Sequence, residues 1–153
     1  MTVKLGSLEA DVARETEGDW VSLDGLSMEL LTGTLRLPDL PNTQLKVRSL
    51  NYPPYQLARS RAEQRLKRRY ADTALAPQEE QAEVYGPIMA EHLLLDWRGF
   101  DIPYSMEAAR EALSNPRHRQ LRSYLIAAAA KIGEVEAQFF DDAEKNSARP
   151  SAG

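Results

Sequence analysis

A pair of prolines, Pro53 and Pro54, divides the chain into two parts with different hydrophobic periodicity. Proline cannot donate a backbone hydrogen bond to a sheet, but it is tolerated in the first turn of a helix. Before the pair, apolar and polar residues alternate, as in strands that bury one face, and after it apolar residues recur at helical spacing. The change predicts an α+β fold, with a small antiparallel β-rich module at residues 1–52 and a helical domain at residues 53–146.

Three short alternating stretches precede the prolines. They are DWVSL at residues 19–23, GTLRLPDL at residues 33–40 and QLKVRSL at residues 44–50. Such stretches, bounded by Gly, Pro and Asn, are typical of short strands. The segment PDLPNT between the last two is typical of a loop, so residues 30–50 are expected to form a hairpin.

About four helices are expected after the prolines. Ser105 is the expected N-cap of the third, because its hydroxyl can accept a hydrogen bond from a free N–H of the first turn. Gly99 is expected to end the second, since glycine adopts the left-handed conformation common at helix C-termini. The small, polar residues 147–153 are expected to form a disordered tail. The expected helices cover residues 55–72, 77–98 with a kink or break at Gly86–Pro87, 104–115 and 116–145.

The last expected helix carries a narrow apolar face. Its apolar residues recur at alternating spacings of four and three, as in the heptad pattern of helices that pack against one another. The pattern indicates that this face contacts another helix. The residues are Leu121, Leu125, Ala128, Ile132, Val135 and Phe139.

Residue types that carry catalysis and metal binding are scarce. The chain has no cysteine and two histidines, His92 and His118, which lack the spacing of a zinc site. We interpret His92 as a partly buried packing residue and His118 as an exposed one. No glycine-rich phosphate loop or nucleophile elbow occurs, and no segment has the roughly 20 apolar residues that a membrane span needs. We therefore expect no enzymatic activity, cofactor, metal or membrane association.

A basic run covers residues 59–70, where six of twelve residues are Lys or Arg and one is acidic. It has three interpretations: the solvent face of an amphipathic helix, a strip for an acidic protein partner, or a strip for nucleic-acid phosphates. We favour them in that order. The formal net charge of −4 and the absence of a known nucleic-acid motif place nucleic acid last. The candidate partner-binding residues in the run are Arg61, Arg65 and Arg68.

Aromatic residues cluster around Gly99. Trp97, Phe100 and Tyr104 surround this glycine within eight residues of sequence. Aromatic side chains beside turns usually cover the edge of a small core, but they are also frequent anchors in protein interfaces. The sequence leaves both interpretations open.

Several segments, taken in order, resemble the tail assembly chaperones of long-tailed siphophages. They are VRSLNYPPYQLARSR, RRY, GPIMAEHLLLDWRGF, IPYSMEAAREAL and FDDAEKN, which together span roughly residues 45–146. The most telling part is an apolar stretch that ends in Asp96-Trp97-x-Gly99 and is followed by Pro103-Tyr104-Ser105. The turn after the tryptophan is shorter here than in that family.

The resemblance implies a non-enzymatic role in the host cell cytoplasm. Such chaperones hold the long, helical and apolar tape measure protein, recruit tail tube subunits, and are absent from the finished virion. Many are made in a short and a frameshifted longer form, and self-association of this chain is expected. The alternative is a structural virion protein of the phage tail or neck. The candidate partner-binding residues are Trp97, Tyr104, Leu121, Leu125, Ile132 and Phe139, together with the three arginines of the basic run.

Overall fold

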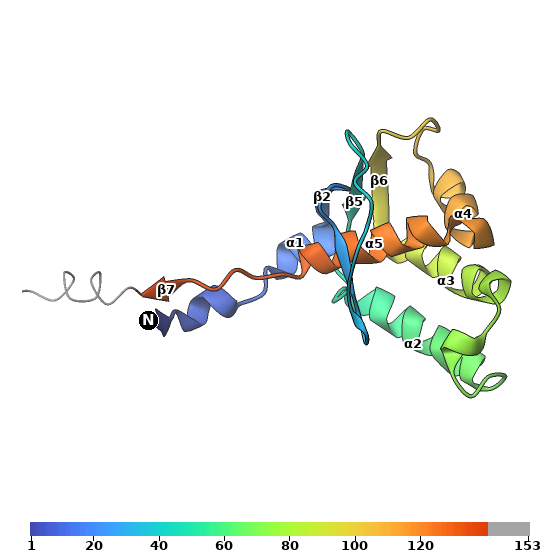
Figure 1. Ribbon diagram of the computed structural model, residues 1–153, viewed down its shortest axis with the longest axis horizontal. Coiled ribbons are helices and arrows are strands. Elements are labelled where there is room, and N and C mark those ends of the chain that lie inside the picture. The colour runs from blue at the N-terminus through green and yellow to red at the C-terminus, as the bar shows by residue number, and fades with distance from the viewer. Residues whose placement is uncertain (141–153) are drawn as a thin grey trace, which may run out of the picture. The chain divides into compact units, whose positions relative to one another are not determined.

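The computed structural model describes residues 1–140. It consists of two compact units. The larger covers residues 12–133, and the smaller combines residues 1–11 with residues 134–140. The tail expected at residues 147–153 lies outside the described residues. The α+β fold class is confirmed, because antiparallel strands precede a series of helices (Figure 1).

The smaller unit is built on a two-stranded antiparallel ladder. Strand β1 (Thr2–Val3) pairs with β7 (Phe139–Phe140), and a short 3-10 helix, η1 (Leu5–Leu8), follows β1. The Lys4 ammonium lies 4.7 Å from the centre of the Phe140 ring. Phe139 therefore lies on a strand in the smaller unit and not on the last helix, where the sequence pattern placed it.

The larger unit contains a three-stranded antiparallel sheet. After helix α1 (Val12–Glu17), the sheet has the order β2 (Asp19–Ser22), β5 (Gln44–Val47) and β6 (Leu94–Arg98). Leu45 of the central strand lies opposite Val21 on one side and Trp97 on the other. Leu45 and Val47 are fully buried, and α5 contacts β5 and β2.

A separate hairpin joins β3 (Ser27–Leu30) to β4 (Gly33–Arg36). The prediction of a hairpin over residues 30–50 is therefore wrong, because β4 pairs with the preceding strand β3, whereas β5 pairs with β2 and β6. A tight turn at residues 31–32 makes the backward pairing possible. Gly33 helps to close that turn with a φ of 132°.

From Pro53 to the end of the described residues the chain forms four α-helices, as expected. They are α2 (Pro53–Lys67), α3 (Gln78–His92), α4 (Met106–Ser114) and α5 (Arg119–Ile132), with short 3-10 helices η2 (Thr73–Leu75) and η3 (Pro116–His118) between them. The expected N-cap is confirmed, since the Ser105 hydroxyl accepts a hydrogen bond of 3.0 Å from the N–H of Ala108. Helix α2 buries one side through Tyr55, Ala62 and Leu66.

The second helix departs from its prediction at two points. It runs without a break through Gly86–Pro87, and it ends at His92, so that Leu94–Arg98 is strand β6 instead of helix. A Cβ on Gly86 would lie 2.6 Å from the Leu113 carbonyl oxygen, so this glycine allows α3 and α4 to approach closely. A short apolar run is compatible with a helix or a buried strand, and here pairing with β5 decides for the strand.

Helix α5 ends at Ile132, well before the expected residue 145. Gly133 follows it, and the Gly133 N–H bonds back to the carbonyls of Ala130 and Lys131. The heptad pattern is therefore interrupted after Ile132, and Val135 lies outside the helix. Leu125 and Ile132 are buried in a core shared by strands and helices, so residues on both sides of the prolines build the same unit.

Candidate protein-binding groove

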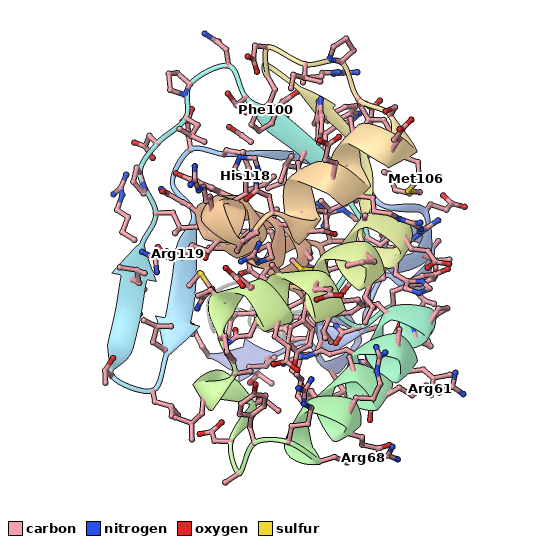
Figure 2. All side chains as sticks on the ribbon, turned by 90° about the vertical axis from the view of Figure 1, so that its right-hand side faces the viewer. Arg61, Arg68, Phe100, Met106, His118 and Arg119 are labelled. Atoms are coloured by element: carbon pink, nitrogen blue, oxygen red, sulfur yellow. The ribbon has the colours of Figure 1, made fainter. Side chains whose placement is uncertain are left out.

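A groove with a volume of about 520 Å³ opens between α2, α3, α5 and the base of β3. All four elements belong to the larger unit. Figure 2 looks toward this side of the molecule, with the hairpin at the left, α3 in front and α2 below. The groove therefore brings together segments that are up to about 100 residues apart, from Met28 to Ile126.

Much of the groove lining is apolar or aromatic. Met28 comes from β3, Tyr55 from α2, Tyr85 and Met89 from α3, and Ile126 from α5. Tyr55 and Met89 are buried, whereas the others are half-buried and present part of their surface to the groove. Burial raises the pKa of Tyr55 and of Tyr85, so both phenols are uncharged at neutral pH. These residues form the uncharged, apolar part of a lining whose other members are mostly polar or charged.

Charged residues of both signs border this lining. On α2, the Arg59 guanidinium lies 3.0 Å from the Glu63 carboxylate, which is one helical turn away. On α5, Arg119 is exposed at the start of the helix, where Figure 2 places it close to the hairpin. Arg122 donates hydrogen bonds to the carbonyls of Leu113 and Asn115, at 3.1 and 2.8 Å, and so holds the end of α4. Arg119 is consequently the more available of the two α5 arginines.

The groove lining has few of the residue types that commonly carry catalysis or bind metals. It contains neither histidine nor cysteine, and its one carboxylate, Glu63, is already paired with Arg59. Among residues 1–140, no cluster of three or more His, Cys, Asp or Glu side chains could hold a metal ion. Within the same range, no helix has the length and hydrophobicity to span a membrane. A lining that mixes apolar and charged side chains can contact both the apolar stripe of an amphipathic helix and the charges beside it.

The aromatic corner is the turn that follows β6, with Trp97, Phe100 and Tyr104. The Trp97 indole N–H donates a hydrogen bond of 2.7 Å to the Ile102 carbonyl. Its ring packs edge-on against Tyr104 at 5.4 Å and lies 5.5 Å from the Phe100 ring. Trp97 is 9% exposed, and burial raises the pKa of the half-buried Tyr104. These two side chains therefore hold the corner together.

The apolar seam predicted as a partner-binding face is not a continuous surface. Leu125 and Ile132 are 0% and 2% exposed, and Leu121 is half-buried. Phe139 is exposed, but it belongs to the smaller unit. In this conformation Leu125 and Ile132 stabilise the core and present no surface to a partner.

The arginines of the basic run fall into two groups, those in ion pairs and those exposed without one within residues 1–140. Two of its arginines are tied to acidic residues: Arg59 to Glu63, and Arg69 to Glu80 at 2.6 Å. Arg61, Arg65 and Arg68 are exposed, and no carboxylate of the described residues forms an ion pair with them. Figure 2 shows Arg61 and Arg68 directed away from the body of the molecule along α2. Their role as a partner-binding surface stays a prediction.

The groove itself was missed by sequence reasoning. Met28, Tyr85 and Met89 come from separate elements, and each looks like an ordinary core residue in its own segment. A weak signal was present in the amphipathic stretch before Gly33, where Met28 alternates with exposed polar residues. Their assembly depends on long-range packing, which local periodicity does not encode.

The comparisons with known proteins concern most of this unit. The family model described as YdaY prophage protein matches residues 50–146, which is more than half of the 153-residue chain. No curated protein and no solved structure matched. The matched region includes α2, α3, β6, α4 and α5, and thus every residue that lines the groove except Met28. The chain therefore belongs to the YdaY prophage protein family and is of phage origin.

Proposed function

We propose that the protein is a phage tail assembly chaperone that binds the tape measure protein through the groove between α2, α3 and α5. The observation that carries the proposal is the lining of this groove, with the half-buried Met28, Tyr85 and Ile126 beside charged residues on α2 and α5. Such a surface accepts the apolar side of a helix and leaves the polar side of that helix in water. The phage origin of the chain and its resemblance to tail assembly chaperones both support this assignment.

The physical need for such a protein is clear. A long helical protein with exposed apolar stripes aggregates unless those stripes are covered. Several weakly binding copies along one client would gain avidity without any single tight contact. In this proposal the protein acts by binding alone, associates with further copies of itself, recruits tail tube subunits in the host cytoplasm and leaves before the virion is complete.

A pull-down tests the proposal. A tagged form of the protein is co-expressed with helical fragments of the tape measure protein from the same phage. We expect at least one fragment to co-purify with the wild-type chain. Failure of every tape measure fragment to co-purify would remove the proposal.

A matched pair of variants locates the binding site. Ser123 is half-buried and lines the groove, whereas Gln120 is exposed on the same helix outside the groove lining. Ser123→Trp should fill the groove and abolish co-purification, while Gln120→Trp adds the same ring without effect. If both variants lose binding equally, α5 does not tolerate a tryptophan at either position. If both bind like the wild type, the client binds outside the groove.

A structural virion protein is the second candidate. It is favoured by the exposed apolar side chains in and after the aromatic corner, Phe100, Ile102 and Met106, which are 37%, 56% and 46% exposed. Exposed apolar side chains of this kind suit a permanent interface as well as a transient one. Mass spectrometry of purified phage particles separates the two candidates, because a chaperone is absent from the particle and a structural protein is present in stoichiometric amounts.

A further inference from the structure

The β3–β4 hairpin has two chemically different faces. Met28 lies opposite Leu35, and Leu30 lies opposite Gly33. Because residues two apart on a strand share a face, Met28, Leu30 and Leu35 lie on the same side of the hairpin. The other side carries polar residues, where the Thr34 hydroxyl is 3.1 Å from the Glu29 carboxylate.

The apolar face of the hairpin is continuous with the groove. Met28 is a lining residue of the groove, so the side of the hairpin that carries Met28 is the side that borders it. Leu30 and Leu35 extend this side beyond the groove and are 47% and 49% exposed. Leu31, in the turn that joins the strands, is completely exposed. In Figure 2 the two strands stand at the left, with this turn at their lower end.

The base of the hairpin is anchored, whereas its tip is free of the core. Leu26 and Leu37 flank the two strands, are 2% and 4% exposed, and are joined by a backbone hydrogen bond of 2.9 Å. The Tyr124 hydroxyl of α5 donates a hydrogen bond to the Pro38 carbonyl just after the hairpin. An isolated two-stranded sheet is marginally stable in water, and its exposed leucines, two near the turn and Leu35 opposite Met28, form an apolar surface that a partner can cover.

We infer that this hairpin is a wall of the binding site, which extends the groove and packs its leucines against an amphipathic helix of the client. The inference rests on the proposed function and specifies how the client is held. A strand of four residues spans about 13 Å, which corresponds to between two and three turns of an α-helix. The client helix would therefore lie with its apolar side on Ile126 and Met28 and continue along Leu35 and Leu30.

The extent of the apolar surface distinguishes a helical client from a small ligand. A small molecule held inside the groove would contact Met28 but would leave the outer leucines in water. A helix that is several turns long covers both regions at once. Arg119, which is exposed on α5 beside the groove, fits a client helix that carries an acidic residue next to its apolar stripe.

The experiment compares two double variants of the hairpin. Leu30→Thr with Leu35→Thr removes the apolar side but keeps residues that favour strands. Glu29→Ser with Thr34→Ser removes the cross-strand polar contact on the opposite side and serves as the control. Binding of the co-purifying tape measure fragment is measured by titration calorimetry. The leucine variant should bind about tenfold more weakly or worse, and the control variant should bind like the wild type.

A crosslink adds a readout that does not depend on the folding of a variant. A photoreactive benzoylphenylalanine in place of Leu31 should crosslink to the tape measure fragment. Crosslinking between two copies of this chain alone would show that the hairpin contacts another subunit, and would overturn the inference. If the leucine variant binds with wild-type affinity while Ser123→Trp does not bind, the hairpin is not part of the binding site, and the proposed function stays intact. If neither variant changes binding, both proposals fall.

Discussion

The aromatic corner and the β3–β4 hairpin are both short turn regions rich in large apolar residues, yet they use them differently. At the corner, Trp97 is 9% exposed and its indole N–H is hydrogen-bonded within the turn. At the hairpin, Leu30, Leu31 and Leu35 are exposed and contribute little to the core. The type of residue at a turn therefore does not reveal its role, whereas the burial and the hydrogen-bond partners of its side chain do.

The largest expected effect lies at the corner. Trp97→Ala should lower the free energy of unfolding by about 3–5 kcal/mol, because it leaves a cavity and removes the bond to Ile102. Urea denaturation followed by circular dichroism measures the loss. Trp97→Phe, which keeps a ring but lacks the donor, should be less damaging. A loss below about 1 kcal/mol for Trp97→Ala would mean that the corner is not held by this side chain.

A smaller effect is expected where the corner leads into α4. Ser105→Ala removes the N-cap acceptor for the Ala108 N–H and should cost about 1 kcal/mol of the free energy of unfolding. The same denaturation experiment measures it. Ser105→Asp, which restores an acceptor and adds a favourable charge at the helix start, should recover the stability. No difference between the alanine and aspartate variants would contradict this role of the cap.

The hairpin should show the opposite behaviour. Leu30→Thr with Leu35→Thr changes exposed residues, so the free energy of unfolding should change by less than about 0.5 kcal/mol. Client binding, in contrast, should be strongly weakened. A large loss of stability in this variant would show that the leucines stabilise the fold, and the contrast between the two turn regions would disappear.

The smallest effect concerns the exposed arginines of α2. Arg61→Glu with Arg68→Glu should leave stability unchanged and weaken binding of an acidic client segment by roughly threefold at low salt. The difference should vanish at high salt, because screening acts strongly on exposed charges. Arg110→Glu with Arg117→Glu makes the same change of net charge at other exposed positions. An equal effect in both variants would show that net charge, and not α2, is responsible.

Much of the fold could be predicted from local patterns. The change of periodicity at Pro53–Pro54 indicated strands followed by four helices, and Ser105 marked the start of α4 correctly. Predictions failed where distant segments decide the outcome. Leu94–Arg98 forms a strand because β5 has a free edge there, and β4 turns back to β3 instead of pairing with β5.

The candidate site was harder to predict than the fold. The aromatic corner could be recognised because Trp97, Phe100 and Tyr104 are close in sequence. The sequence left open only whether they cover the edge of the core or anchor an interface. The groove combines Met28 with residues of α2, α3 and α5, and nothing in those segments alone indicates that they meet. Leu125 and Ile132 had the spacing of an interface seam, but the same spacing also describes the buried side of a core helix.

The most direct test of the account measures client binding by three forms of the protein. Wild type, Gln120→Trp and Ser123→Trp are titrated with the tape measure fragment that co-purifies best. The account predicts equal affinity for the first two and no measurable binding for Ser123→Trp, whose new ring occupies the groove. Undiminished binding by a folded Ser123→Trp variant would contradict the claim that the groove between α2, α3 and α5 holds the client.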